Sequence, residues 1–550
     1  MGYQTKNKVR IVTAASLFDG HDVSINIMRR IMQSMGAEII HLGHNRSVLE
    51  IVEAAIEEDV QGIAITSYQG GHIEFFKYMR DMLNENGYGH VQIFGGGGGT
   101  IHPLEIEELH QYGITKIYSP DDGRKLGLEG MIEEVIRKCD FSLDEEIRVE
   151  GAITWGEIKE VRKIARQITL AENGVQQEIA KPGLAIPVLG ITGTGGAGKS
   201  SLTDEFVRRF LYAYPSKTVA VISVDPSKKK TGGALLGDRI RMNSISSPRV
   251  YMRSMATRES EGSLSGAVQS AIDICCSHEF DLVILESAGV GQSDASITSH
   301  CDMSLYVMTP EYGAASQLEK INMLDYADVI ALNKSDKAGA QDALHDVRKQ
   351  YKRNHQQWEE KDEDLPIVAT ISSQFNDRGV NLLFQKVIAV MEYNKGFVFG
   401  NQVSVEVLTD SIVQAVLPAR RVRYLSEIAD EVRKYNRLAK EQSEVASVLY
   451  KLTGTLEVLR NAGSNDLISG IEEQVKKYEK MLFPVCKKLV EEWAQTKERF
   501  SQKFIEYEVR GKLIKKPLRF ETLSGTSVPR ISVPKYNHGC GTAGCCCQHC

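Results

Sequence analysis

The chain has 550 residues, of which 42% are hydrophobic and 25% are charged, and its formal net charge is −6. This length is too great for one hydrophobic core and predicts about three or four domains. The weak negative charge gives no reason to expect nucleic acid or an anionic membrane as a partner, and no apolar run is long enough to span a bilayer. Because the N-terminus also lacks the apolar core of a signal peptide, we expect a cytoplasmic protein.

The cysteines fall into two groups. Five of the ten lie within residues 540–550, and the other five are scattered along the chain, at Cys139, Cys275, Cys276, Cys301 and Cys486. Scattered cysteines of this kind are typical of free thiols in a reducing compartment, which agrees with a cytoplasmic location.

Residues 1–142 are predicted to form an α/β domain of five strand–helix units. Strands are expected at Val9–Ala15, Glu38–Gly43, Gly62–Thr66, Val91–Gly95 and Lys116–Ser119. Helices are expected at Ile25–Met35, Val48–Glu58, Ile73–Asn86, Leu104–Tyr112 and Leu128–Lys138. The short connections require a parallel sheet with helices on both faces, and ligands of such sheets bind beyond the carboxyl ends of the strands.

Unusual residues gather in the loops at those carboxyl ends. The first loop contains Asp19 and His21, the third runs from Thr66 to His72, and the fourth has five consecutive glycines from Gly95. An Asp-x-His pair fits a metal ligand whose second ring nitrogen is held by a carboxylate, although a lone pair of this kind also fits a solvated loop. Five glycines remove the side chains from one wall, which suits a large flat ligand.

These loops resemble those of the cobalamin-binding domain of the B12-dependent mutases, which has a flavodoxin-like (βα)5 fold. The resemblance implies that His21 is the lower cobalt ligand of adenosylcobalamin and that Asp19 orients His21. It also implies that the displaced nucleotide tail of the cofactor enters a cleft lined by Ser67, Gly95, Gly96, Gly97 and Gly98. Two positions depart from the family motifs, with Ser24 in place of Gly and Gln69 in place of Leu.

A phosphate-binding loop opens the second predicted domain, residues 186–400, which follows a helical linker at residues 143–185 with a helix around Ile158–Leu170. The loop follows an apolar strand, Ile186–Ile191, and precedes a segment of helical spacing, so its backbone N–H groups are expected to surround phosphate. Lys199 would neutralise the terminal phosphates, and the Ser200 hydroxyl would hold Mg²⁺. The motif consists of Gly193, Thr194, Gly195, Gly196, Ala197, Gly198, Lys199 and Ser200.

Acidic residues at strand ends predict two parts of a nucleotide site: the metal side, which would hold Mg²⁺, and the base side, which would bind the nucleotide base. Asp225 follows the strand Thr218–Val224, Glu286 closes an apolar strand at 282–285, and Asp238 lies in a Gly-rich loop, so all three can steer Mg²⁺. Asn333-Lys334-Ser335-Asp336 follows the strand Val329–Leu332. The Asp336 carboxylate can accept hydrogen bonds from N1–H and the exocyclic amine of guanine, a donor pair that adenine lacks. This pattern favours GTP over ATP.

The domain resembles the MeaB-type G-protein chaperones that serve methylmalonyl-CoA mutase and couple GTP hydrolysis to handling of cobalamin. The resemblance implies Mg²⁺ contacts from Ser200, Asp225, Asp238, Glu286 and Ser287, and catalytic roles for Lys199, Asp225 and Glu286. Gln292 is a candidate for positioning water, and an amide that anchors its loop is an equal alternative. Nucleotide contacts are implied for Gly193, Gly195, Gly196, Ala197, Gly198, Lys199, Ser200, Ser201, Arg241, Asn333, Lys334 and Asp336.

The remainder of the chain is predicted as a helical linker region, residues 401–525, followed by residues 526–550. Long amphipathic helices are expected at Ser426–Leu452 and Ile471–Glu508, as a dimer or interdomain surface or as a plain solvated bundle. The order of modules resembles the fused isobutyryl-CoA mutase family, in which a stretch like Val528–Tyr536 begins a substrate-binding barrel. The Cys-rich end could bind zinc, but its adjacent cysteines lack C-x₂-C spacing, and we interpret it as a frameshift or truncated gene model.

The leading hypothesis is therefore a cobalamin-binding, GTP-hydrolysing chaperone portion of a fused acyl-CoA mutase. Its expected ligands are adenosylcobalamin and GTP or GDP with Mg²⁺, its expected state is a homodimer, and acyl-CoA would bind only through a missing substrate domain. One alternative is a non-catalytic cobalamin sensor or carrier with a GTP switch. A second alternative is a metal-dependent ATPase without cobalamin, which Asp336 disfavours.

Overall fold

The computed structural model divides the chain into two compact units, Met1–Thr409 and Asp410–Cys550, which are described separately. The structure describes residues 3–143, 160–180, 183, 185–258, 264, 266–289, 295–312, 315–400, 424–463, 467–509, 512–522 and 525–533. Gln292 and the Cys-rich end therefore lie outside the described residues. In the described part of the chain, no helix combines the length and apolar character needed to cross a membrane.

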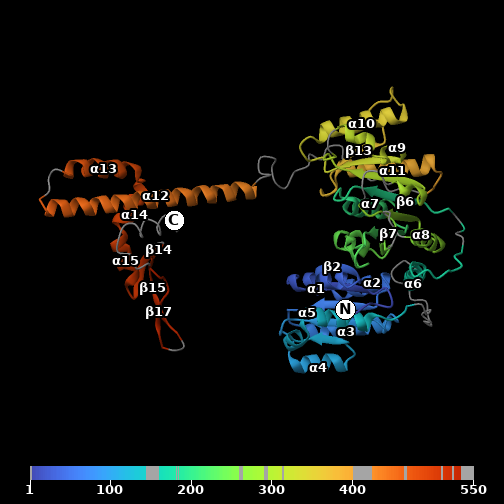
Figure 1. The fold of residues 1–550 in the computed structure, drawn as a ribbon, viewed down its shortest axis with the longest axis horizontal. Coiled ribbons are helices and arrows are strands. Elements are labelled where there is room, and N and C mark those ends of the chain that lie inside the picture. The colour runs from blue at the N-terminus through green and yellow to red at the C-terminus, as the bar shows by residue number, and fades with distance from the viewer. Residues whose placement is uncertain are drawn as a thin grey trace. The chain divides into compact units, whose positions relative to one another are not determined.

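The first sheet, whose N-terminal strands are blue in Figure 1, has the strand order of a flavodoxin-like domain. Its strands are all parallel and run in the order β5-β4-β3-β1-β2-β8. The first five follow one another in the sequence and confirm the predicted (βα)5 class, whereas β8 comes from far along the chain. The strands are β1 (Arg10–Ser16), β2 (Glu38–Arg46), β3 (Gly62–Thr66), β4 (Gln92–Gly96), β5 (Lys116–Tyr118) and β8 (Ala234–Leu236).

Helices cover both faces of this sheet because each buries one apolar stripe. Met32 of α1 and Ile132 of α5 pack against Ile11 on one face, while Ile51 of α2 and Phe76 of α3 share a core with the other face. Ser47 and Ser119 form capping boxes at the starts of α2 and α5, which fix where these helices begin. The helices are α1 (Val23–Ser34), α2 (Val48–Glu57), α3 (His72–Glu85), α4 (Pro103–Gln111) and α5 (Pro120–Cys139).

The second sheet is also parallel, and it carries the phosphate-binding loop. Its order is β13-β12-β11-β6-β10-β7-β9, so β6, which leads into that loop, lies at the centre. The strands are β6 (Val188–Gly193), β7 (Val219–Asp225), β9 (Val250–Ala256), β10 (Leu282–Glu286), β11 (Met303–Met308), β12 (Val329–Asn333) and β13 (Ile367–Thr370). The confirmed fold class is thus a flavodoxin-like domain followed by a P-loop α/β domain.

Two helical layers cover the second sheet. The layer of α7 (Lys199–Ala213) and α11 (Arg378–Ala389) packs on one face. The opposite layer is α6 (Val161–Glu172), α8 (Val268–Ser277), α9 (Met323–Tyr326) and α10 (Ala340–His355), and its core is continuous with that of α2 and α3. Short helical turns complete the unit: η1 (Asp238–Arg241), η2 (Ser244–Ser246), η3 (Ser296–Ser299), η4 (Ala315–Lys320) and η5 (Val390–Asn394).

The second unit contains four helices and two hairpins among its described residues. The long helix expected at Ile471–Glu508 is wrong: it is broken at Pro484, which cannot continue a helix, and residues 504–509 form a strand. The elements are α12 (Tyr424–Asn461), α13 (Ile468–Met481), α14 (Pro484–Glu491), α15 (Trp493–Ser501), β14 (Phe504–Val509), β15 (Lys512–Pro517), β16 (Arg519–Glu521) and β17 (Ser527–Pro529).

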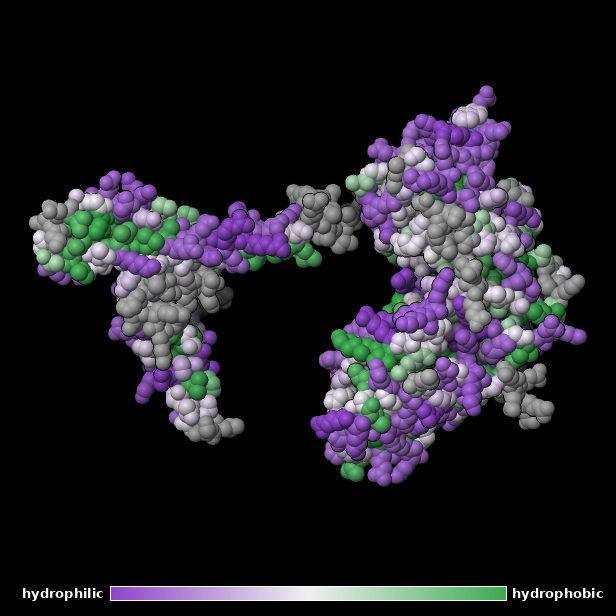
Figure 2. All heavy atoms as spheres, in the orientation of Figure 1, coloured by the Kyte–Doolittle hydropathy of each residue, from purple (hydrophilic) through white to green (hydrophobic). Residues whose placement is uncertain are grey.

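Packing in the second unit is thin. Ala446 of α12 and Leu482 beyond α13 are buried against each other, and Gln442 donates to the carbonyl of Met481 and accepts from the N–H of Phe483. Apolar side chains remain exposed along the helices, as Figure 2 shows, and they include Leu425, Ile428 and Val432 of α12. These helices therefore bury little apolar surface within the unit itself.

Candidate functional site

The loop after β1 holds Asp19 and His21 in one hydrogen-bonded pair. Nδ1 of His21 lies 2.8 Å from Oδ1 of Asp19, and the backbone N–H of His21 donates to the same oxygen at 2.9 Å. Oδ2 of Asp19 accepts from the N–H of Tyr68 at 2.7 Å. Burial raises the pKa of Asp19, but the hydrogen bonds from Tyr68 and His21 outweigh burial and hold that pKa below its ordinary value.

The pair is arranged as a metal ligand and its orienting carboxylate. Asp19 is fully buried, whereas the side chain of His21 is 67% exposed. Because Nδ1 donates to Asp19, the free lone pair of the imidazole lies on Nε2, at the exposed edge of the ring. The geometry matches the predicted Asp-x-His arrangement, and it presents one nitrogen ligand to a group beyond the sheet.

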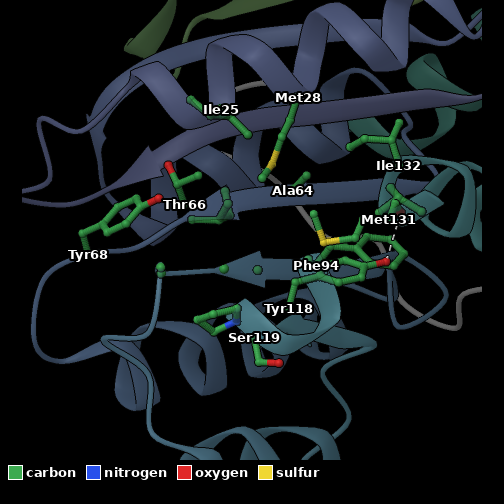
Figure 3. A pocket seen from close by; sticks show the side chains of 18 of the residues that line it. Ile25, Met28, Ala64, Thr66, Tyr68, Phe94, Tyr118, Ser119, Met131 and Ile132 are labelled. Atoms are coloured by element: carbon green, nitrogen blue, oxygen red, sulfur yellow. Dashed lines mark hydrogen bonds between the residues drawn. The ribbon is translucent and has the colours of Figure 1, made fainter. Parts of the chain in front are cut away.

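A cavity of about 230 Å³ lies beside this pair, between α1, α5 and the carboxyl ends of β3 and β4. Figure 3 shows Thr66 and Tyr68 at one end of the cavity and Met131, Ile132 and Tyr118 at the other. The ring of Tyr68 also lies 5.3 Å from the ring of His21, measured between centroids, so the cavity and the exposed imidazole share one wall. The lining is mainly apolar, and it includes Ile25, Met28, Met32, Phe94 and Val135.

The predicted glycines line this cavity, but for more than one physical reason. A Cβ on Gly97 would lie 2.2 Å from the carbonyl oxygen of Ser67, and Gly98 has a φ of +57° that favours glycine. A Cβ on Gly95 would collide with Phe76 on the far side of the strand, so packing alone requires that glycine. Gly95, Gly96, Gly97 and Gly98 all border the cavity as expected.

Ser67 lies behind the cavity wall rather than in it. Its hydroxyl accepts from the hydroxyl of Ser16 at 3.0 Å, and its neighbours Thr66 and Tyr68 line the cavity instead. Tyr68 is held by Ser24, since their hydroxyls lie 2.8 Å apart, so the Ser that departs from the family motif braces this wall. Sequence reasoning placed Thr66 and Tyr68 in the third loop at the ligand end of the sheet, but it did not identify either as a residue that lines the cavity.

The residues present fit the tail of a cobalamin. Within the described part of the chain, the buried hydroxyl of Thr66 in the cavity wall has no hydrogen-bond partner, which is unusual because an unsatisfied buried hydroxyl is unfavourable. An apolar cavity with one unsatisfied hydroxyl, next to an exposed imidazole, suits an aromatic base with few polar atoms. A large flat cofactor could therefore place its base here and its metal at His21.

The phosphate-binding loop is preformed between β6 and α7. Gly198 has a φ of +92°, and a Cβ on it would lie 2.5 Å from Nδ2 of Asn333, so only glycine fits between the two loops. Nζ of Lys199 donates to the carbonyls of Gly193 at 3.1 Å and Thr194 at 3.4 Å. Burial lowers the pKa of Lys199, against the opposing effect of Glu286. The ammonium group thus lies on the rim of the loop, where phosphate oxygens would replace the carbonyls.

The predicted metal-side residues come together at the start of α7. The Ser200 hydroxyl lies 2.9 Å from Oδ1 of Asp238 and 2.8 Å from Oε1 of Glu286. Oε2 of Glu286 also accepts from the hydroxyl of Thr203 at 2.9 Å, a partner that sequence reasoning missed although it lies one helical turn after Lys199. Asp225 lies at the end of β7, where Oδ2 accepts from the N–H of Gly237.

Buried carboxylates crowd together here, which is a suitable environment for a cation. Burial, followed by the charge of Asp238, raises the pKa of Asp225 to about 7 and that of Glu286 to about 8. In the described residues, no three His, Cys, Asp or Glu side chains gather closely enough to hold a metal ion alone. Mg²⁺ at nucleotide sites takes one or two carboxylates together with phosphate oxygens and water, so this shell suits Mg²⁺ bound with a nucleotide.

Two predicted contacts lie apart from this shell. The hydroxyl of Ser287 donates to the hydroxyl of Thr192 at 2.8 Å and is buried between strands. The side chain of Arg241 is 66% exposed, and Nη1 lies 4.0 Å from Oδ1 of Asp238, at the edge of the site. Ser287 therefore supports the sheet in this structure, and Arg241 is free to turn toward a nucleotide.

The base side is assembled around Asn333. Its Nδ2 donates to the carbonyl of Ala197 at 2.8 Å and to the hydroxyl of Ser372 at 3.0 Å, which ties the base loop to the phosphate loop. Nζ of Lys334 donates to the carbonyl of Gly196 at 2.7 Å. Asp336, three residues after Asn333, is exposed to solvent.

The fold and these two sites define the class: a cobalamin-binding domain joined to a P-loop GTPase-type domain. Residues 9–119 match the family described as B12 binding domain, and residues 152–446 match the family described as Methylmalonyl Co-A mutase-associated GTPase MeaB. The chain therefore belongs to the MeaB family and carries a B12-binding domain in front of it.

Similar proteins have the same order of modules. The chain is 50% identical to a fused isobutyryl-CoA mutase of Geobacillus kaustophilus, over 97% of this chain and 50% of that protein. It is 49% identical to a fused isobutyryl-CoA mutase of Cupriavidus metallidurans, over 96% of this chain and 49% of that protein. The chain is also 44% identical to a fused isobutyryl-CoA mutase of Nocardia farcinica, over 98% of this chain and 50% of that protein. The chain thus spans about half the length of the curated relatives it matches.

Proposed function

We propose that this chain binds adenosylcobalamin through His21 and hydrolyses GTP with Mg²⁺, as the chaperone portion of a fused acyl-CoA mutase. The observation that carries the proposal is the Asp19–His21 pair beside an apolar cavity, within the same compact unit as a phosphate loop surrounded by buried carboxylates. An Asp at position 336, suited to guanine, supports GTP as the nucleotide.

On the cobalamin side, each residue has a role that its geometry supports. Asp19 keeps the Nδ1 proton of His21 and leaves Nε2 free to ligate cobalt. The cavity between α1 and α5 excludes water from the tail of the cofactor, and the Thr66 hydroxyl can donate to a ring nitrogen there. Bound adenosylcobalamin supplies a cobalt–carbon bond that can be cleaved homolytically.

On the nucleotide side, Lys199 would exchange its two backbone carbonyl acceptors for phosphate oxygens. Ser200, Asp225, Asp238 and Glu286 would hold Mg²⁺, which neutralises phosphate charge. Lys199, Asp225 and Glu286 are the proposed catalytic residues, because Lys199 belongs to the phosphate loop and its charge acts on both carboxylates. Asp336, next to the Asn333 brace, would accept from both guanine donors.

Three further parts of the proposal concern the wider protein. Isomerisation of isobutyryl-CoA and n-butyryl-CoA would require acyl-CoA contacts from the part of the relatives that this chain does not span, so we expect no turnover from this stretch alone. A homodimer would cover the exposed apolar side chains of α12. A cytoplasmic location agrees with Cys139, Cys275, Cys276 and Cys301, which are free thiols within the described part of the chain.

The experiment combines cobalamin binding with nucleotide turnover on the full chain. We expect adenosylcobalamin to show the absorbance of base-off, His-ligated cobalamin, and His21→Ala to abolish that spectrum. We also expect GTP hydrolysis that Lys199→Ala reduces by at least about a hundredfold, since removal of one phosphate-binding charge in a buried site removes about 3 kcal/mol or more of transition-state stabilisation. Cobalamin binding without any GTP hydrolysis would instead indicate the sensor or carrier.

A further inference from the structure

The segment between Asp225 and Asp238 belongs to both domains. It leaves β7 at Asp225, runs beside the first sheet as β8, and returns to the nucleotide site at Asp238. In between, β8 pairs in parallel with β2, with Glu38 opposite Ala234 and Ile40 opposite Leu236. Gly233 makes this approach possible, because a Cβ there would lie 2.1 Å from the carbonyl oxygen of Gln33. Two metal-side carboxylates thus flank a strand of the cobalamin-binding sheet.

Neighbouring residues at the end of this segment face opposite sites. Asp238 accepts from the hydroxyls of Ser200 and Ser223 within the nucleotide site. Arg239, the next residue, is buried and donates to Glu58 at 2.6 Å and to Glu57 at 2.7 Å, both at the end of α2. A displacement of Asp238 along η1 would therefore also displace Arg239 and its ion pairs at the end of α2, a helix that packs on β1 and β2.

Ile240 extends the connection toward the cobalt-ligand loop. Gly43 of β2 has a φ of +87°, and the Cδ1 atom of Ile240 would lie 2.6 Å from a Cβ built on it, so the Ile240 side chain rests on the Gly43 backbone. Two residues further on, the N–H of Asn45 donates to the carbonyl of Asp19 at 3.3 Å. Oδ1 of Asn45 accepts from the N–H of Phe18 at 2.8 Å. The end of β2 thereby holds the loop at Phe18 and at Asp19, just before His21.

The nucleotide site supplies a reason for this segment to have two arrangements. One Ser200 hydroxyl lies within hydrogen-bond distance of Asp238 and of Glu286, but it has one proton and can donate to only one of them. Mg²⁺ that takes the Ser200 oxygen and the Asp238 carboxylate as ligands would use lone pairs of both groups and so change what Asp238 accepts. A ligand shifts an equilibrium only through such differential contacts.

We propose that the segment Asp225–Arg241 transmits the state of the nucleotide site to the Asp19–His21 pair, with Ile240 and Asn45 as positioning residues. The inference rests on the proposed function and adds the route by which its two sites communicate. The link is short and continuous: Asp238 moves η1, Ile240 moves the Gly43 backbone, and Asn45 moves the loop that carries Asp19. Nucleotide binding would then change how firmly His21 is presented to cobalt.

The test measures coupling rather than activity. Adenosylcobalamin is titrated into the full chain by absorbance, with and without a non-hydrolysable GTP analogue and Mg²⁺, and coupling is the ratio of the two dissociation constants. We expect a ratio of roughly 5–150-fold for the unmodified chain, the usual range for linked sites. Ile240→Ala should bring the ratio close to one while each ligand alone binds within about threefold of its original affinity, because Ile240 is 40% exposed and contacts neither ligand site.

Matched variants separate positioning from general damage. Leu382→Ala truncates a comparably exposed side chain on α11 and should leave the ratio unchanged. Ile240→Val removes Cδ1, the atom nearest Gly43, but keeps Cγ1, so the ratio should fall between those of the unmodified chain and Ile240→Ala. Asn45→Ala should reduce both the ratio and the fraction of His-ligated cobalamin.

Three results would overturn the proposal, and they are distinguishable. A ratio near one in the unmodified chain, with both ligands bound, removes the coupling and leaves the proposed function standing. An unchanged ratio in Ile240→Ala removes this route. Failure of the unmodified chain to bind cobalamin or nucleotide removes the proposed function, and this inference with it.

Discussion

Removal of Arg239 tests how strongly buried charges hold the two sheets together. Arg239 joins Glu57 and Glu58 of α2, and all three side chains are less than one-tenth exposed. Arg239→Met keeps the length of the side chain but leaves two carboxylates without that partner. Breaking a buried ion pair from one side destabilises a protein by about 3–5 kcal/mol, because the remaining charge is buried and uncompensated.

The local contacts indicate that the free energy of unfolding lost in Arg239→Met lies near the lower end of that range. Glu58 retains Arg10, whose Nη2 lies 2.6 Å from Oε2 of Glu58. Burial already raises the pKa of Glu57 to about 7, so this carboxyl can take up a proton when Arg239 is absent. We therefore expect a loss of about 3 kcal/mol at pH 8 and less at pH 6, since a group with a raised folded pKa contributes stability that is lost as the pH rises through that value.

Thermal unfolding of the full chain by circular dichroism measures the effect. A loss of about 3 kcal/mol should lower the midpoint of the first unit by roughly 3–4 °C, because a unit of this size unfolds with a large entropy. Arg353→Met is the matched control: Arg353 pairs with Glu319 at 3.2 Å, but the two side chains are 50% and 61% exposed, so its removal should cost less than about 1 kcal/mol. Arg239→Met/Glu57→Gln should recover part of the loss. Equal midpoints for Arg239→Met and Arg353→Met would refute the reasoning.

Three other predictions follow from buried or base-reading groups. Burial, followed by the charge of Arg29, lowers the pKa of His41 to about 4, so neutral His41 contributes at most about 3 kcal/mol to the free energy of unfolding above pH 6.5, and this contribution is lost as the pH falls toward 4. In urea titrations at several pH values, His41→Gln should therefore reduce the loss of stability between pH 6.5 and pH 4, and an unchanged loss would contradict this prediction. Thr66→Val should leave stability equal or higher, because it removes an unsatisfied hydroxyl, and should weaken adenosylcobalamin binding by roughly tenfold; unchanged affinity would show that the hydroxyl does not face the tail. Asp336→Asn should weaken GDP binding by roughly 10–100-fold in calorimetry and favour xanthosine diphosphate, while equal GDP affinity would exclude Asp336 from base reading.

Sequence reasoning predicted the elements whose signals are local. Strands β1 to β5 of the first sheet lie within a few residues of their expected bounds, because each is a short apolar run followed by an amphipathic helix. The Asp19–His21 pair and the phosphate loop were found because their chemistry is contained in a few consecutive residues. The broken helix at Pro484 also had a local signal, the proline itself, which the Glu- and Lys-rich pattern on either side obscured.

Contacts between distant segments were not predictable in this way. β8 has only three residues and lies within a Gly-rich loop, and its partner β2 lies far earlier in the chain. Neither the spacing of hydrophobic residues nor the strand propensity of single residues therefore identifies the pairing. Thr203 and Ser223 join the metal-side shell because α7 and β7 bring them to Glu286 and Asp238, which no motif states. The buried Arg239 likewise looked like one more loop charge until its partners in α2 were known.

The placement of β8 has a consequence for how this protein can be divided. Without β8, β2 would be an edge strand with a row of open backbone hydrogen-bonding groups, the kind of surface that pairs with other chains and aggregates. A fragment cut at residue 142 would expose that edge and also leave Glu57 and Glu58 without Arg239. The cobalamin-binding domain is therefore expected to be soluble only when the nucleotide-binding domain is expressed with it. A shortened protein made for biochemical work should contain both domains.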